Sequence, residues 1–325
     1  MGWADALCCR VAMHLKAESE RTRVGLCADC RQMRLITTDR GSAFYLCGQS
    51  AHDPTFPKYP CLPVTQCTGY DPKVLRIHKA GHEIRSIGDW FKWAPPKMGA
   101  RQWKDGRSAK ELTRCWFRSG AASPPEELRL LLEQAFSAEI RFHEGKPECV
   151  IDLDHFPGED RNCDLVLLCG LGMQRMVVNV EAKADEPFGD TTIGDCYDRT
   201  ADSRSNVPAR IRQLSLALFE RPPDESIRKL RYQLLHAVAA TLIEAAASGA
   251  ELGLFLVHEF RSVGLNSKKL AQNSTDLENF VRAFPELAVA VLEKNQILGP
   301  VSVPGGERVP RSVPLYLGKL VTEIE

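Results

Sequence analysis

An aspartate, a glutamate and a lysine near the middle of the chain have the types and spacing needed for metal-assisted chemistry. Residues 162–189 read NCDLVLLCGLGMQRMVVNVEAKADEPFG, which predicts two short strands joined by a tight turn at residues 170–172. Because alternate side chains of a strand share a face, Glu181 and Lys183 point to the same side of the second strand. If the hairpin turns near residue 172, Asp164 lies opposite Glu181.

Two carboxylates placed in this way create a site for a cation. Directly opposed residues of a hairpin hold their Cβ atoms ~5 Å apart, and two like charges at that distance are destabilising unless something lies between them. Oxygen ligands at this separation suit Mg²⁺ or Mn²⁺, and Lys183 would hold a nucleophilic water or neutralise charge that develops on a phosphate. The alternative is that Asp164 and Glu181 are exposed on an edge, with Lys183 as a surface ion-pair partner.

This charged pattern resembles the signature of a known superfamily. Asp164 followed by Glu181-Ala182-Lys183 is similar to the motif of the PD-(D/E)XK nucleases, whose fold is restriction-endonuclease-like. From about residue 88 onward the chain also resembles a bacterial family within or near that superfamily, through the segments GRSAKE (106–111), EAKADEPFG (181–189), PARI (208–211), RYQL (231–234) and HEF (258–260). The sequence departs from the signature at Cys163, where the name of the superfamily has a proline, a position that often varies.

The resemblance implies metal-dependent hydrolysis of phosphodiester bonds in a nucleic acid, and DNA is expected before RNA. Asp164, Glu181 and the main-chain carbonyl after Glu181 would bind Mg²⁺ or Mn²⁺, and Lys183 would orient or help deprotonate the attacking water. Gln233 sits where some relatives place a glutamine near the active site. Relatives often add a glutamate from the helix before the sheet, for which Glu139 is our candidate and Glu148 the alternative.

The argument for Glu139 depends on a helix expected after Ser123. Ser123 would be the N-cap, Pro124 the first helical residue and Glu126 the end of a capping box. Glu139 falls on the leucine-rich face of this helix, where a carboxylate is costly unless it is paired or metal-bound. The alternative is that the helix ends just before Glu139 and leaves this residue in solvent.

Charge and hydropathy exclude several classes of partner. The chain has 42 basic and 42 acidic residues, so its zero net charge provides no global attraction to nucleic acid or to an acidic membrane. No apolar run approaches the ~20 residues that cross a bilayer, and the first residues lack a basic signal-peptide region. We therefore expect a cytoplasmic protein without a membrane partner, with a homodimer left open.

Contact with nucleic acid must then come from a local basic patch. Four arginines follow the charged hairpin, in a polar stretch and a helix predicted over residues 208–219: Arg199, Arg204, Arg210 and Arg212. We expect them to contact phosphates, although each alone could be a solvated surface charge.

Cysteines gather near the start of the chain. Of the twelve, five fall between Cys27 and Cys67. Without a signal peptide, such thiols are expected to be reduced or to bind a metal. Cys27, Cys30, Cys47 and Cys67 supply the four ligands of a tetrahedral Zn²⁺ site, which can fold a segment too short to bury a core.

Alternatives to this ligand set stay open. The run FPKYPCLPVTQC (56–67) resembles small bacterial cysteine-cluster proteins, and it leaves Cys61 as a spare ligand and His52 as a rival. An iron–sulfur cluster is the second choice of cofactor, since some relatives of the nuclease superfamily carry four cysteines for one. The remaining alternative is a reduced, metal-free loop.

Together these patterns predict a mixed α/β protein in several parts. Residues 1–24 are expected to be poorly structured, 25–70 to form a zinc-ribbon-like module, 71–87 to be a linker and 88–325 to be the nuclease-like domain. For that domain the predicted order is helix, three strands, helix, strand, which is the αβββαβ core of the restriction-endonuclease-like fold. A terminal helix is expected over residues 280–293.

Overall fold

The computed structural model describes residues 20, 22–38, 42–156, 161–201, 204–262 and 267–324. The chain divides into two compact units, Met1–Leu75 and Arg76–Glu325. The expectation of a poorly structured N-terminus falls almost wholly outside the described residues. Each unit is considered by itself below.

The small unit is an antiparallel hairpin with irregular segments around it. Its elements are η1 (Leu26–Asp29), β1 (Met33–Thr37), β2 (Ala43–Cys47) and η2 (Gly48–Ala51). The two strands pair from Met33 with Cys47 to Thr37 with Ala43. Since most side chains of this unit remain partly exposed, its own apolar core is small.

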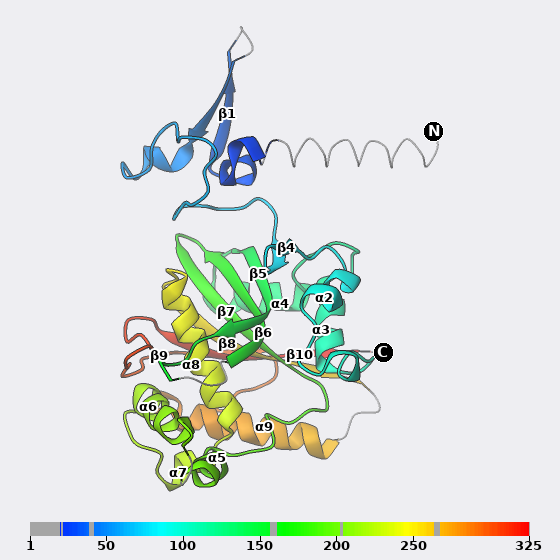
Figure 1. The fold of residues 1–325 in the computed structure, drawn as a ribbon, viewed down its shortest axis with the longest axis vertical. Helices are drawn as coiled ribbons and strands as arrows, with labels where there is room; N and C mark the ends of the chain where they lie inside the picture. Colours follow the sequence, from blue (N-terminus) through cyan, green and yellow to red (C-terminus); the bar gives the residue numbers. More distant parts are fainter. Residues whose placement is uncertain are drawn as a thin grey trace. The chain divides into compact units, whose positions relative to one another are not determined.

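The large unit is built on a mixed eight-stranded sheet. The strands are β3 (Arg76–Lys79), β4 (His82–Glu83), β5 (Ile140–Ile151), β6 (Arg161–Leu171), β7 (Gln174–Lys183), β8 (Leu252–Arg261), β9 (Gln296–Val301) and β10 (Leu315–Glu323), in the spatial order β4-β3-β5-β6-β7-β8-β10-β9 (Figure 1). β5, β6 and β7 form an antiparallel meander, and β8 pairs parallel to both β7 and β10. Because β3 pairs with β5, the stretch expected to be a linker instead provides two strands of the sheet.

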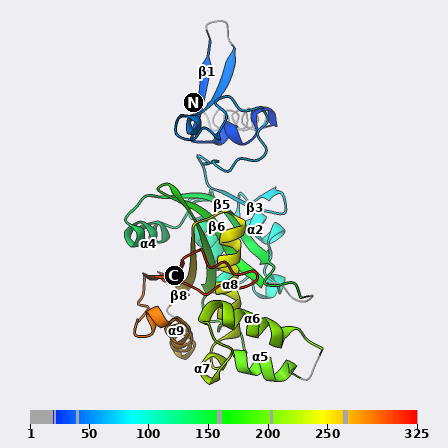
Figure 2. The ribbon, with the colours of Figure 1, turned by 90° about the vertical axis from the view of Figure 1, so that its left-hand side faces the viewer.

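Helices cover both faces of this sheet. They are α2 (Ile87–Trp93), α3 (Ser108–Trp116), α4 (Glu126–Phe136), α5 (Ile193–Thr200), α6 (Val207–Phe219), α7 (Glu225–Arg228), α8 (Tyr232–Ala247) and α9 (Ser267–Arg282), with short 3₁₀ turns η3 (Gly99–Arg101) and η4 (Pro285–Leu287). Asn179 of β7 bonds to α8, whereas Thr322 of β10, on the other face, bonds to Glu127 of α4. Figure 2 shows α4 and α8 on either side of the strands, with α5, α6 and α7 grouped at one end of α8.

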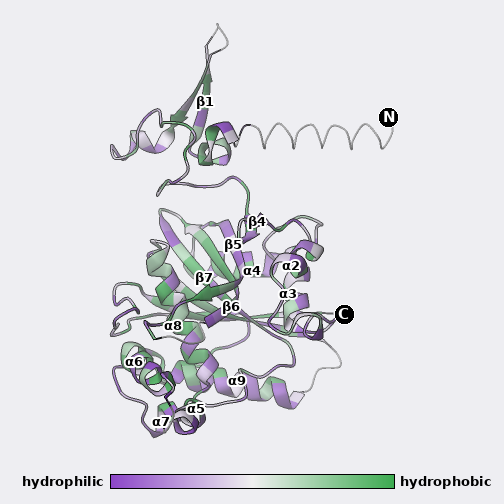
Figure 3. Cartoon of the chain, viewed as in Figure 1, coloured by the Kyte–Doolittle hydropathy of each residue, from purple (hydrophilic) through white to green (hydrophobic). Residues whose placement is uncertain are grey.

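The core lies mainly between the sheet and α8. Figure 3 shows hydrophobic residues along the central strands and along α8. Val177 and Phe255 of the strands meet Leu234 and Val238 of the helix in one buried cluster. Since the sheet is covered on both faces, β7 is buried from Met176 to Lys183, and its charged residues are buried with it.

The predicted order of elements is present: α4, β5, β6, β7, α8 and β8 follow one another, with α5 to α7 inserted before α8. The polar stretch after residue 189, for which no helix was predicted, contains α5, whose start is a capping box formed by Thr192 and Asp195. The expected terminal helix is wrong: α9 ends at Arg282, and residues 285–287 form η4. No helix in the described ranges is long and apolar enough to cross a membrane.

Candidate active site

The predicted register of the central hairpin is confirmed. β6 and β7 pair from Leu171 with Gln174 to Leu165 with Val180, so Asp164 and Glu181 are the next residues of the two strands. Beyond Leu165 the ladder changes, because Oδ2 of Asp164 accepts a hydrogen bond from the backbone N–H of Ala182 at 2.8 Å. The carboxylate thus lies at the end of the ladder, where the strands stop pairing through their backbones.

A left-handed residue interrupts the regular alternation of β5 at this point, while the pairing of β5 with β6 keeps its register on both sides. Lys146 reaches Glu244 of α8, with Nζ and Oε1 3.4 Å apart, and Cys149 packs against the core that α8 covers. Residues three apart would lie on opposite faces of a regular strand. Glu148 between them has a left-handed φ of 48°, which reverses the alternation. The Glu148 side chain consequently leaves the regular pattern and enters the site, where it accepts a hydrogen bond from Asn162.

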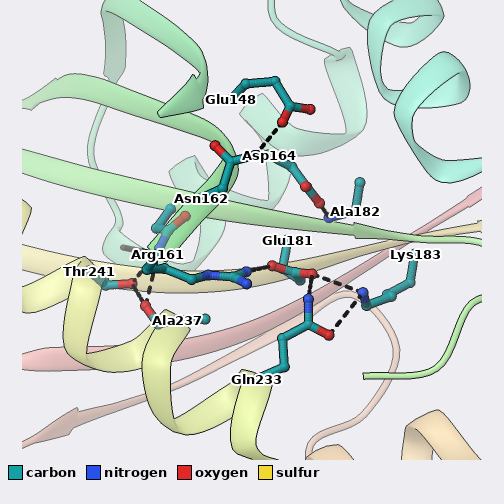
Figure 4. Close-up of polar contacts among 11 residues, drawn as sticks. Glu148, Arg161, Asn162, Asp164, Glu181, Ala182, Lys183, Gln233, Ala237 and Thr241 are labelled. Carbon is teal, nitrogen blue, oxygen red and sulfur yellow. Dashed lines mark hydrogen bonds and ion pairs between the residues drawn. The ribbon is translucent and has the colours of Figure 1, made fainter. Parts of the chain in front are cut away.

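Glu181 is the centre of the polar contacts. Its Oε2 pairs with Arg161, and its Oε1 lies 2.8 Å from Nζ of Lys183 and 2.6 Å from Nε2 of Gln233 (Figure 4). Glu181 is only 2 % exposed and Lys183 6 %. The first turn of α8 therefore supplies Gln233 to the same spot that the ends of β6 and β7 form.

Burial and neighbouring charges divide the carboxyl groups into two kinds. Burial would raise the pKa of Glu181, but Arg161 and Lys183 together lower it below its ordinary value. Burial, followed by the charge of Glu181, raises the pKa of Asp164 to about 8. Burial likewise raises the pKa of Glu148 to about 7. Near neutral pH the site therefore holds one firmly ionised carboxylate and two that can exchange protons.

These groups line one cavity of about 270 Å³. Its walls include Glu148, Asp164, Glu181, Lys183 and Gln233, facing Pro96, Lys97, Gln102, Ser108 and Ala109. One wall thus comes from the sheet and α8, and the other from the segment between α2 and α3 together with the start of α3. A cavity with convergent polar groups of shifted pKa is the best candidate for a functional site in this unit.

Glu139 does not belong to this site. α4 begins at Glu126 rather than after Ser123 and ends at Phe136, because Ser137 adopts a left-handed conformation. Glu139 is left exposed just before β5. The alternative candidate, Glu148, is the glutamate that lines the cavity.

The four predicted arginines do not form a common surface at the cavity. Arg210 is 5 % exposed and forms a buried ion pair with Asp154, so it serves packing between α6 and the end of β5. Arg199, Arg204 and Arg212 are exposed, but none of them lines the cavity. The prediction of a phosphate-binding patch is therefore wrong for Arg210, and for the other three it stays a prediction.

The four predicted cysteine ligands come together in the small unit. Cys27, Cys30, Cys47 and Cys67 all line one cavity of about 20 Å³. Cys61 is exposed in a neighbouring hollow, and His52 is exposed and lines neither of the two. Burial and then the neighbouring thiols raise the pKa of Cys27 to about 11. Because ionised thiols at this spot repel one another, a cation among them would stabilise their charged form.

Neither group of ligands is already arranged as a closed metal site. In the part of the chain that the structure describes, no group of three or more histidine, cysteine, aspartate or glutamate side chains is arranged to hold a metal ion. Mg²⁺ commonly takes only one or two protein carboxylates and completes its shell with water, so the pair Asp164 and Glu181 fits that ion. Four thiols around one cavity fit Zn²⁺ in ligand type and number.

Sequence reasoning missed Arg161, Asn162 and Lys97. Arg161 and Asn162 stand just before Asp164 on β6, and that proximity was the available signal. Asn162 contacts Glu148, whose left-handed conformation no local pattern indicates, and Arg161 contacts Glu181 of the neighbouring strand. Lys97 lies more than sixty residues before Asp164 in the chain, so only the tertiary structure brings it to the cavity.

Comparison with known proteins places the large unit in a family. A family model described as "Domain of unknown function (DUF6946)" matches residues 83–324. The chain belongs to the DUF6946 family. No curated protein and no solved structure matches the chain. The DUF6946 domain thus contains β5 to β8, α8 and the whole candidate site from Pro96 to Gln233.

Proposed function

We propose that the DUF6946 domain hydrolyses phosphodiester bonds of nucleic acid, DNA foremost, in a reaction that depends on Mg²⁺ or Mn²⁺. The observation that carries this proposal is the convergence of Asp164, Glu181 and Lys183 on one cavity, in the register expected from the sequence. The order α4, β5, β6, β7, α8, β8 supports it, since it is the order that the resemblance to restriction-endonuclease-like proteins implies.

Asp164 and Glu181 would hold the cation, with the backbone carbonyl of Ala182 beside them. Bound there, Mg²⁺ or Mn²⁺ would lower the pKa of water and offset the charge that builds on the phosphate. The chain's own contribution is to keep Glu181 ionised through its two cationic neighbours.

Lys183 would hold the attacking water. Its Nζ lies 2.8 Å from Oε1 of Glu181 and 3.4 Å from Oε1 of Gln233, and the Phe188 ring, 5.2 Å from Nζ, limits its motion. Glu148 lines the same cavity, and its pKa of about 7 allows either protonation state near neutrality, so it would accept a proton there. We assign it the position that the sequence suggested for Glu139.

The small unit would hold Zn²⁺ through Cys27, Cys30, Cys47 and Cys67, in a structural role. Four thiols and the repulsion among their ionised forms support this assignment. An iron–sulfur cluster is the second choice of cofactor for the same ligands. A cytoplasmic location and a homodimer stay predictions from the sequence.

Cleavage of plasmid and single-stranded DNA, with and without added Mg²⁺ or Mn²⁺, tests the proposed activity. We expect metal-dependent cleavage, and we expect Lys183→Ala and Glu181→Gln each to lower its rate at least ~100-fold, as loss of a group that acts on the reacting atoms does. Lys229→Ala, on the exposed end of α7, should leave the rate unchanged. Wild-type protein that cleaves neither substrate with either metal would contradict the proposal.

A second candidate function is a nuclease-like scaffold that binds nucleic acid or protein through the zinc module and does not cleave. The observation that favours it is the buried ion pair between Arg161 and Glu181, because Arg161 competes with a cation for the same carboxylate. If the scaffold is correct, DNA binding persists in Glu181→Gln and cleavage is absent from every form. If the enzyme is correct, isothermal titration should detect Mg²⁺ binding that Asp164→Asn weakens.

A further inference from the structure

We propose that residues 92–104, the segment from the end of α2 to the approach to α3, form the surface that receives the phosphate backbone beside the candidate active site. This proposal rests on the proposed function, since it names where the nucleic acid would bind around that same cavity. It also replaces the arginines suggested by the sequence with a different set of cations.

The segment is strongly basic within a chain of zero net charge. It contains Lys92, Lys97, Arg101 and Lys104, all exposed, and no acidic residue. The nearest acidic residues on either side bind other partners: Asp89 accepts from the backbone N–H of Arg85 at 3.1 Å, and Asp105 pairs with Lys110 at 2.8 Å. The segment therefore carries a local excess of positive charge.

The segment borders the cavity directly. Pro96, Lys97 and Gln102 line the cavity together with Asp164 and Lys183. A phosphate bound through a cation at the carboxylates would have its neighbours along the nucleic-acid strand several ångströms away. Cations that begin at the cavity wall and continue outward along residues 97–104 are placed to contact those neighbouring phosphates.

Aromatic side chains hold this segment to the large unit. Trp90 is 2 % exposed, Trp93 stacks on His82 with ring centroids 3.6 Å apart, and Phe91 contacts Trp103 at 5.0 Å. These contacts anchor the segment at both ends. The aromatics thus serve packing, and the lysines and the arginine around them lie at the surface, where a ligand can reach them.

Salt-dependent binding of a fluorescent DNA duplex to the full chain tests this surface. The Lys183→Ala chain, without added Mg²⁺ or Mn²⁺, provides a background in which the DNA stays intact. Two triple variants are compared in it: Lys97→Glu/Arg101→Glu/Lys104→Glu, and Arg199→Glu/Arg204→Glu/Arg212→Glu. Both change the net charge equally, and all six residues are exposed, so folding, checked by circular dichroism, should be retained.

Between about 50 and 200 mM salt, we expect the first triple variant to reduce the magnitude of the negative slope of log affinity against log salt by about 2–3. We expect it to weaken the affinity itself by roughly tenfold or more. The arginine triple variant should keep the parent slope. An unchanged slope in the first variant, an equal change in both, or no measurable binding by the parent chain would overturn the proposal.

Cleavage by the wild-type chain separates this proposal from the one on which it rests. Cleavage together with an unaffected slope would mean that the surface is wrong and the activity stands. A slope that falls as expected, in a protein that never cleaves, would mean that the surface stands and the activity is wrong.

Discussion

Glu181 is held on both carboxylate oxygens by donors from three elements. Arg161 of β6 takes Oε2, while Lys183 of β7 and Gln233 of α8 take Oε1. A buried carboxylate needs such partners, because removing a charge from water costs several kcal/mol. The arrangement stabilises the ionised form that a cation requires, and it also places Arg161 in competition with that cation.

Arg161→Ala should destabilise the protein by about 3 kcal/mol without added metal, because it leaves Glu181 buried with less compensation. Added Mg²⁺ should restore part of the loss by taking the place of the guanidinium. Urea unfolding followed by circular dichroism, with and without Mg²⁺, measures both effects. A loss below ~1 kcal/mol would mean that the ion pair is worth no more than a surface pair.

The protonation of Glu148 makes stability depend on pH. Its pKa is raised to about 7 by burial, so the folded protein binds a proton more tightly than the unfolded chain does. The stabilisation from that proton is present at pH values below the ordinary carboxyl range and is lost as the pH rises towards 7.

Glu148→Gln removes this dependence while keeping a side chain that can accept from Asn162. As the pH rises from 5 to 8, the free energy of unfolding of the variant minus that of wild type should increase by about 1–3 kcal/mol. Unfolding curves at the two pH values, without added Mg²⁺, check the result. A constant difference between the two proteins would show that Glu148 is ionised throughout this range.

At the scale of elements, the contact between β7 and α8 positions the candidate site. Asn179 donates to the carbonyl of Ala237 at 3.1 Å and to Oγ1 of Thr241 at 3.0 Å. Both acceptors lie on α8, which carries Gln233 at its start. The buried hydrogen bonds of Asn179 thus fix how α8 lies along the strand that ends in Glu181 and Lys183.

Asn179→Ala should cost about 1–3 kcal/mol of stability, through a lost pair of buried hydrogen bonds and a small cavity. It should also lower cleavage, because Gln233 would be placed less accurately. Met173→Ala, in the exposed turn of the hairpin, is the control and should change neither quantity. Normal activity in a destabilised Asn179→Ala would show that the helix position does not affect the site.

At the scale of the molecule, the small unit is expected to depend on its metal for stable folding. Cys67→Ser should lower bound Zn²⁺, measured by elemental analysis, and should expose the small unit to proteolysis. Cys61→Ser should change neither, since Cys61 lies outside the shared cavity. Zinc that stays at the wild-type level in Cys67→Ser would exclude the proposed ligand set.

The fold was predictable where the pattern is local. The hairpin β6–β7 follows from strand alternation and turn residues, and α6 lies within a few residues of the helix expected over residues 208–219. The start of α4, the presence of α5 and the position of α9 were missed. α9 is held by a contact with a distant segment, the bond from Asn273 to the backbone of Glu186, whereas the capping box of α5 is a local pattern that sequence reasoning overlooked.

The sequence by itself determined which groups face each other across the hairpin. Strand alternation and a two-residue turn are local properties, so the order of the residues alone assigns Asp164, Glu181 and Lys183 to one place. The tertiary structure decided what surrounds them. Glu148 reaches the cavity through its left-handed conformation, Arg161 pairs with Glu181, and the basic segment 92–104 reaches the cavity through packing between elements far apart in the chain. Such contacts leave no periodic trace in the sequence.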